Sequence, residues 1–155
     1  MDYSINRVEP LHVLQLVTIC AQHAAFEETS YSSDGKAQAL SRALFSHPPR
    51  LFGWVAVANG RIIGYATASC EYSTWAASEY LHLDCLYVIS GQRNSGIGGA
   101  LLASVIAFAR ECRYAQVQWQ TPQWNADARR FYQSQGAMEK KKSRFFLKVG
   151  SADGC

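Results

Sequence analysis

The clearest pattern in the chain is a pair of apolar runs, residues 52–58 and 61–70, separated by Asn59 and Gly60. An Asn-Gly pair between apolar runs is a strong signal for a two-residue hairpin turn, because both residues tolerate the positive φ angles that the turn requires. We therefore predict two antiparallel strands at this position.

Upstream of this hairpin, the pattern predicts a short strand, two helices and a polar loop. Residues 5–8 fit the strand, and Pro10 is well placed to begin a helix whose apolar positions recur for about three turns. Residues 27–35 are polar and predict a loop. The second helix is predicted over residues 36–45 and is ended by Pro48.

A strand, a glycine-rich turn, a helix and a second strand follow in the middle of the chain. The strands are predicted over residues 80–88 and 115–120. Between them, apolar residues spaced by three or four positions form a stripe on one helical face. These residues are Ile97, Leu101, Val105, Phe108 and Cys112. A crossover of this kind predicts that the two strands are parallel.

The C-terminal part predicts one more helix and one more strand. Asn125 is suited to cap a helix that runs to about residue 135, and Gly136 fits its C-terminal cap. Residues 144–149 predict a final strand. The element order is mixed α/β, and no Pro-, Gly- or Ser-rich linker divides it. We therefore expect a single domain over residues 1–150 and a flexible tail over residues 151–155.

Composition limits the classes of function. The 155 residues are 48% hydrophobic, which is enough for one buried core. A net charge of +3 is too small to indicate nucleic acid as a partner. Without a signal sequence or a membrane-spanning apolar run, we expect a cytoplasmic protein with no membrane partner. The five cysteines form no CxxC pair, so we predict neither disulfides nor a metal site.

The glycine-rich turn, QRNSGIGG at residues 92–99, lies directly between a predicted strand and a predicted helix. The first N–H groups of a helix lack intrahelical partners and lie at its positive pole, so this position binds anions. Glycine allows close approach, and Arg93 adds a charged donor suited to phosphate. The turn predicts a pyrophosphate site, although such turns also occur as simple tight connections.

Two common phosphate motifs do not fit this turn. A P-loop requires Gly-Lys-Ser/Thr, and a Rossmann site requires three glycines at fixed offsets and an acidic residue about 20 positions later. The pattern Arg93-x-x-Gly96-x-Gly98 instead resembles the acetyl-CoA pyrophosphate loop of the GNAT superfamily of N-acetyltransferases, and the preceding strand resembles that family's central strand. A second block also resembles the family, with Asn125, then Phe131–Tyr132, then Gly136–Ala137.

This resemblance implies a central mixed, mostly antiparallel sheet with a splayed parallel strand pair, flanked by helices. It also implies acetyl-CoA as the co-substrate, no metal, and, by analogy, a homodimer. The most similar subfamilies are the diamine (spermidine/spermine) and Hpa-type acetyltransferases. The implied cofactor-binding residues are Leu86, Tyr87, Val88, Arg93, Asn94, Ser95, Gly96, Ile97, Gly98, Gly99, Asn125, Ala128, Phe131 and Tyr132.

Direct attack of an amine on the thioester requires proton transfer at two points. An alkylammonium is almost wholly protonated at neutral pH, so a base or a water relay must deprotonate it. Strict alternation along residues 80–88 places His82, Asp84 and Leu86 on one strand face, and Leu81, Leu83, Cys85 and Tyr87 on the other. Asp84 is the first candidate base, acting through a bridging water, and His82 is the alternative.

The resemblance supplies the remaining catalytic roles. It makes Tyr132 the acid that protonates the departing CoA thiolate, and a backbone N–H near Val88 the donor to the oxyanion. Each of these residues also has a purely structural interpretation. Tyr132 is also suited to be a core aromatic residue, Asn125 to be only a helix cap, and Asp84 to lie on a hydrated strand face.

The predicted function is acetyl transfer to a primary amine of a small molecule, of the polyamine, aminoglycoside or amino-acid type. The candidate acceptor-binding residues are acidic or aromatic: Glu27, Glu28, Tyr72, Trp75 and Asp84. One alternative is a protein acetyltransferase that acts on lysine or on an N-terminal amine. Another is a module that binds acyl-CoA as a sensor without turnover, against which the joint presence of Asp84 and Tyr132 argues.

Overall fold

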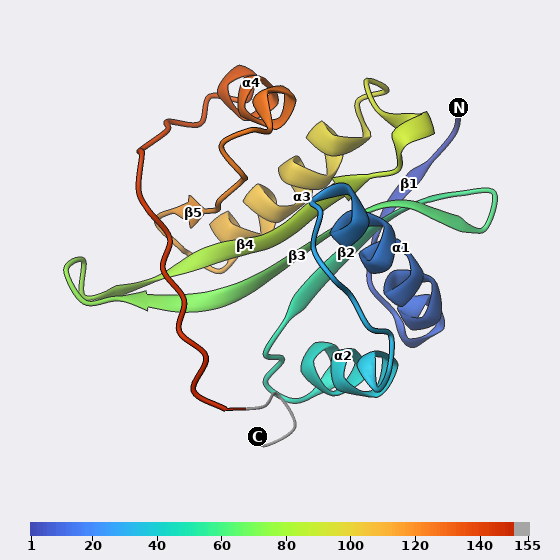
Figure 1. Cartoon of the computed structure of the whole chain (residues 1–155), viewed down its shortest axis with the longest axis horizontal. Helices are drawn as coiled ribbons and strands as arrows, with labels where there is room; N and C mark the ends of the chain where they lie inside the picture. Colours follow the sequence, from blue (N-terminus) through green and yellow to red (C-terminus); the bar gives the residue numbers. More distant parts are fainter. Residues whose placement is uncertain (151–155) are drawn as a thin grey trace. The chain divides into compact units, whose positions relative to one another are not determined.

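The computed structural model describes residues 1–150 (Figure 1). The chain divides into two compact units, Met1–Pro122 and a second that begins at Gln123. The predicted tail, residues 151–155, lies outside the described residues, and the single domain over residues 1–150 stays a prediction.

The first unit contains a five-stranded sheet in the order β1-β2-β3-β4-β5. Its strands are β1 (Ser4–Arg7), β2 (Phe52–Ala58), β3 (Arg61–Ser73), β4 (Ser78–Val88) and β5 (Val117–Gln118). Neighbouring strands are antiparallel from β1 to β4, whereas β4 and β5 are parallel. The predicted mixed, mostly antiparallel sheet and the parallel crossover are therefore confirmed, although β5 is shorter than the predicted strand over residues 115–120.

The turn between β2 and β3 is the predicted two-residue hairpin. Asn59 and Gly60 have φ angles of 50° and 73°. These left-handed values match a turn whose twist suits the flanking strands. The hairpin places β3 in the middle of the sheet, where its residues from Ile62 to Ala68 are buried.

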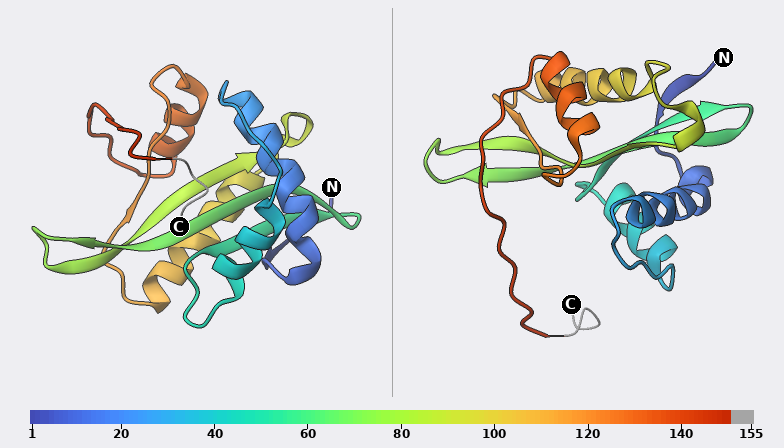
Figure 2. Two further views of the ribbon diagram at one scale, coloured as in Figure 1. Left: turned by 60° about the horizontal axis from the view of Figure 1, so that its bottom comes forward. Right: turned by 45° about the horizontal axis from the view of Figure 1, so that its top comes forward.

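Helices cover both faces of this sheet (Figure 2). A short 3-10 turn, η1 (Pro10–His12), leads into α1 (Val13–Phe26), and α2 (Lys36–Phe45) follows after a loop. These two helices pack on one face, and α3 (Ile97–Glu111) packs on the other. The bounds of α2 are those predicted from the sequence.

The apolar stripe of α3 forms the core on its side of the sheet. Ile97, Leu101 and Val105 are at most 1% exposed, and Phe108 packs its ring 4.6 Å from that of Phe52. Burying one such aliphatic side chain contributes about 1.5–3 kcal/mol. The stripe is confirmed as far as Phe108. It ends before Cys112, which is exposed and caps the helix.

The second unit contains α4 (Ala126–Ser134), with the predicted caps at both ends. The Oδ1 atom of Asn125 accepts a hydrogen bond from the Ala128 N–H at 3.1 Å, and Gly136 follows the helix with a φ of 88°. Helices commonly end on a glycine in this left-handed conformation.

The predicted final strand over residues 144–149 is wrong, because these residues form no strand in the described chain. Phe145, Leu147 and Val149 are each more than 80% exposed. A segment rich in apolar residues forms a strand only where a partner strand supplies hydrogen bonds and a packed face. Within residues 1–150, no helix is long and apolar enough to cross a membrane.

Candidate acetyl-transfer site

Beyond His82, β4 pairs with another strand along only one of its two edges. β4 and β5 pair at Leu81–Val117 and His82–Gln118, whereas pairing with β3 continues as far as Val88. The Ile89 N–H donates to the Ile63 carbonyl at 3.0 Å, on the β3 side. Because N–H directions alternate along a strand, the Val88 N–H points away from β3. The edge from Leu83 to Val88, which we call the open edge of β4, is thus left without a β5 partner.

A β-bulge interrupts β4 at Asp84. Thr67 pairs with Cys85 and Ala68 pairs with Leu83, so Asp84 is the extra residue on β4. Because Thr67 and Ala68 point to opposite faces, their partners Cys85 and Leu83 do as well. The predicted common face for Leu83 and Cys85 is therefore wrong. The bulge shifts the alternation by one residue, which local periodicity does not reveal.

The bulge presents the Asp84 carboxylate at the surface. Its side chain is 58% exposed, and its Oδ1 atom lies 4.0 Å from Nε2 of His82. The two side chains therefore lie close together, although the bulge breaks the strict alternation that predicted a shared face for them. The Cys85 thiol donates a hydrogen bond to the second oxygen of Asp84 at 3.6 Å. A surface carboxylate beside a histidine is suited to exchange protons with water.

The glycine-rich turn joins this edge to α3. After the 3-10 turn η2 (Ser90–Gln92), Asn94 and Gly96 have φ angles of 62° and 82°. A Cβ atom at Gly96 would meet only the Tyr3 hydroxyl, at 3.9 Å, so the left-handed backbone rather than the available space favours glycine. The Ser95 hydroxyl donates to the Gln92 carbonyl inside the turn.

The start of α3 is suited to hold an anion. Its first bond runs from the Ala100 N–H to the Gly96 carbonyl at 3.0 Å. The N–H groups of Ile97, Gly98 and Gly99 therefore precede the intrahelical ladder, at the positive pole of the helix. These amides, together with the open edge of β4, fit an extended molecule that ends in a phosphate group.

Arg93 ties the turn to both β4 and α1. Its Nε donates to the Val88 carbonyl at 3.1 Å. Its guanidinium carbon lies 4.2 Å from the ring centroid of Phe26, and 5.4 Å from that of Tyr87. Such cation–π contacts contribute about 0.5–2 kcal/mol. The predicted contact from Arg93 to a phosphate stays a prediction.

His23, on α1, forms a cluster with Glu27, Tyr65, Asp84, Tyr87 and Arg93. It is not among the residues predicted from the sequence. Its Nδ1 lies 2.7 Å from the Tyr65 hydroxyl, and its Nε2 lies 3.3 Å from a carboxylate oxygen of Glu27. Its ring stacks on that of Tyr87 at 4.8 Å. One signal was present in the sequence: His23 follows Leu16 by seven positions, which places a polar residue on the buried face of the helix.

Burial controls protonation in this cluster. Desolvation lowers the pKa of His23, and the nearby Glu27 carboxylate opposes that shift. Burial also raises the pKa of the Cys85 thiol to about 12, and Asp84 adds to the effect. The pKa of Cys20 is raised for the same main reason. Neither thiol is therefore suited to act as a nucleophile at neutral pH.

The remaining acceptor candidates do not all lie near Asp84. Glu27 contacts His23, and the exposed Glu28 follows it with a φ of 56°. Tyr72 and Trp75 are 65% and 100% exposed on the outer half of the β3–β4 hairpin. Tyr72 lies five residues beyond Thr67, which is roughly 17 Å along a strand. The structure therefore does not bring these two aromatic residues together with Asp84.

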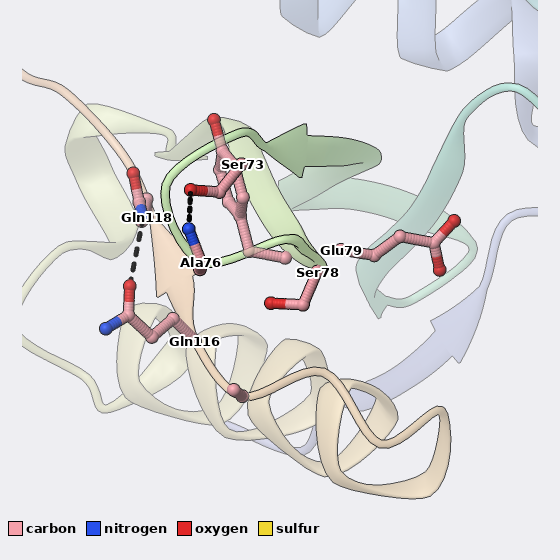
Figure 3. Close-up of a pocket in the computed structure, with 8 residues that line it drawn as sticks. Ser73, Ala76, Ser78, Glu79, Gln116 and Gln118 are labelled. Carbon is pink, nitrogen blue, oxygen red and sulfur yellow. Dashed lines mark hydrogen bonds between the residues drawn. The ribbon is translucent and has the colours of Figure 1, made fainter.

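A small pocket lies at that outer end of the hairpin (Figure 3). Its lining includes Ser73, Ser78, Tyr80 and Gln116. Tyr80 and Val88 are eight residues apart on β4, which is roughly 26 Å at 3.3 Å per residue. This pocket is therefore separate from the open edge of β4.

In the second unit, α4 carries three of the predicted residues, Ala128, Phe131 and Tyr132, and Asn125 is its N-cap. Asn125 caps the helix through Ala128, and the rings of Phe131 and Tyr132 lie 5.3 Å apart. Both aromatic side chains are partly buried. Over residues 1–150, no three His, Cys, Asp or Glu side chains come together in a group that could hold a metal ion.

Comparison with known families agrees with this geometry. Residues 17–137 match the Acetyltransferase (GNAT) family, and this match covers most of the chain. The chain belongs to the GNAT acetyltransferase family. It is thus an acetyltransferase of a family that uses acetyl-CoA, as its glycine-rich turn and the block from Asn125 to Ala137 predicted.

Individual GNAT relatives also resemble this chain. It is 26% identical over 131 residues to a thialysine N-epsilon-acetyltransferase of Caenorhabditis elegans, covering 84% of this chain and 80% of that protein. An integron cassette protein from the mobile metagenome of V. cholerae shares its fold at a TM-score of 0.78 and 26% identity, covering 97% and 94% of the two chains. The aminoglycoside N-acetyltransferase AAC(6')-Iy, in complex with CoA, gives a TM-score of 0.82 at 20% identity over 96% of each chain.

Proposed function

We propose that this GNAT acetyltransferase transfers the acetyl group of acetyl-CoA to a primary amine of a small molecule, by direct attack in a ternary complex. The observation that carries the proposal is the exposed Asp84 carboxylate, held by a β-bulge four residues before the end of the open edge of β4. A carboxylate at this point is able to bind an ammonium group and to accept its proton.

The open edge of β4 and the start of α3 support acetyl-CoA as the donor. The pantetheine arm carries amide groups, which suit the backbone donors and acceptors of a strand edge. The diphosphate suits the N–H groups of Ile97 to Gly99. Val88 lies between these two features, so its N–H is the proposed donor to the oxyanion that forms on the thioester carbonyl.

The acceptor is proposed to be a small cationic amine because two carboxylates lie in the cluster. Asp84 is on β4 and Glu27 is at the end of α1, and both act electrostatically on His23. The thialysine acetyltransferase and the aminoglycoside acetyltransferase are named for small amines, which supports a polyamine, an aminoglycoside or an amino-acid acceptor. Binding roles for Glu28, Tyr72 and Trp75 stay predictions.

The proposed reaction balances without an oxidant or a metal. The ammonium loses one proton to Asp84, through a bridging water, or to His82. The free amine forms a C–N bond with the thioester carbon, and the C–S bond breaks as the amide forms. Tyr132 is the proposed acid that protonates the CoA thiolate, a role that rests on the family block around it. The nitrogen loses its second proton as the amide forms, and this proton restores the Tyr132 hydroxyl through solvent. Asp84 then releases its proton to water.

A panel of amines tests the proposal. Spermidine, thialysine, an aminoglycoside and a lysine-containing peptide would each be incubated with acetyl-CoA while thiol release is measured. Release with at least one small amine, but not with the peptide, is the expected result. Release with the peptide alone would favour protein acetylation. Acetyl-CoA binding by calorimetry without release from any amine would favour the sensor module.

A further inference from the structure

His23 is a largely buried histidine with a partner on each of its two ring nitrogens. It lies on α1, with 13% of its side chain exposed. Tyr65 on β3 and Glu27 at the end of α1 contact opposite sides of the imidazole, at 2.7 and 3.3 Å. Neither the sequence motifs nor the proposed acetyl transfer assigns a role to this histidine.

The partners determine which ring nitrogen carries the proton. A carboxylate only accepts hydrogen bonds, so Nε2 must carry the hydrogen and donate it to Glu27. In the neutral ring, Nδ1 is then an acceptor, and the Tyr65 hydroxyl must be its donor. Burial raises the pKa of Tyr65, which keeps that hydroxyl protonated. Tyr65 therefore donates a hydrogen bond to His23, and His23 donates one to Glu27.

These two hydrogen bonds fix the direction of the Glu27 carboxylate. Glu27 is the C-terminal cap residue of α1, and its side chain is 35% exposed. A carboxylate at a helix end has several rotamers, and a hydrogen bond from a buried ring selects one of them. The selected oxygen faces His23, and the carboxylate remains partly accessible to solvent.

The surroundings of His23 combine both signs of charge. Glu27 and Asp84 are the acidic groups that act on it, and Arg93 is the basic group. Tyr65 from β3 and Tyr87 from β4 are the aromatic residues that face its ring. A neutral His23 leaves the two carboxylates free to attract a cation, whereas a protonated His23 would compete with that cation.

We propose that His23 is a positioning residue of the acceptor site, which holds Glu27 in place to bind the ammonium group of the amine. The inference rests on the proposed acetyl transfer to a small amine. His23 does not touch the thioester in this scheme, so its loss should act on the KM for the amine more than on kcat.

The test compares His23→Phe with the parent protein, using thialysine and spermidine as acceptors. Phenylalanine keeps a ring against Tyr87 and removes both hydrogen bonds. We expect the KM for the amine to rise about tenfold, kcat to change less than threefold, and the acetyl-CoA Kd to stay the same. Glu27→Gln should raise the same KM. Glu111→Gln, which changes a carboxylate at the end of α3, is the matched control and should change nothing.

The double variant distinguishes positioning from general damage. If His23 acts through Glu27, His23→Phe combined with Glu27→Gln should be no worse than Glu27→Gln alone. Tyr65→Phe provides a second test if His23→Phe is poorly folded, and it should raise the KM for the amine in the same direction. The KM should also rise in the parent once the pH falls far enough below the ordinary histidine range to protonate His23, but not in His23→Phe.

Three results would overturn the inference: an unchanged KM for the amine in His23→Phe or Tyr65→Phe, an additive double variant, or a parental pH profile in His23→Phe. If the parent acetylates neither amine, the proposed function fails, and the inference fails with it. If the parent is active and the variants match it, only the inference fails.

Discussion

The guanidinium of Arg93 lies 4.2 Å from the ring centroid of Phe26, so the glycine-rich turn rests directly on the last residue of α1. The same side chain donates to the Val88 carbonyl at the end of β4. One residue therefore links the proposed diphosphate turn, the proposed oxyanion donor and the helix that carries Glu27. A change at Arg93 should for this reason affect more than one binding step.

Replacing Arg93 by alanine should weaken acetyl-CoA binding by about tenfold or more, because the turn loses both a charge and its anchor to Val88. Calorimetric titration with acetyl-CoA measures this. Arg110→Ala is the matched control, since it removes the same charge from the other end of α3, about 20 Å away. Equal losses in both variants would mean that only overall charge matters.

Replacing Tyr132 by phenylalanine should lower kcat by roughly a hundredfold to ten-thousandfold, because one general acid is lost while the ring remains beside Phe131. The value of kcat/KM for acetyl-CoA should fall in parallel. Steady-state thiol release measures both quantities. Tyr114→Phe removes a hydroxyl outside the proposed site and should leave turnover unchanged. Parental turnover in Tyr132→Phe would return this tyrosine to a packing role.

The cysteines should differ sharply in reactivity. Burial raises the pKa of Cys85 to about 12, so at pH 8 its thiolate fraction is roughly a thousandfold below that of free cysteine. Iodoacetamide should therefore label the exposed Cys112 well before Cys85 in the folded protein. Peptide mass spectrometry of timed samples measures the order. In denaturant the two should react alike, and equal labelling of the folded protein would contradict the burial of Cys85.

Stability should decrease as the pH falls through about 6.5, the ordinary pKa of histidine. Desolvation lowers the pKa of His23 in the folded chain. In this range the unfolded chain takes up a proton that the folded chain does not. The free energy of unfolding therefore decreases as the pH decreases. Urea unfolding at pH 5 to 8 measures the slope. His23→Phe should show a smaller slope between pH 5 and 7, and an unchanged slope would contradict the assignment.

Local sequence determined most of the elements and the cofactor turn. The Asn59–Gly60 hairpin, the bounds of α2 and the apolar stripe of α3 each depend on residues close together in the chain. The same is true of the turn from Arg93 to Gly96, because a helix start binds anions through its own backbone. These features need no knowledge of distant contacts, so the sequence was sufficient to predict them.

Tertiary structure decided the features that depend on partners. The bulge at Asp84 arises from the register between β3 and β4, and the position of His23 beside Tyr65 arises from packing α1 on the sheet. Residues 144–149 were predicted to form a strand, yet they form none in the described chain. Strand pairing, burial and pKa shifts all depend on groups distant in sequence, which a local pattern does not contain.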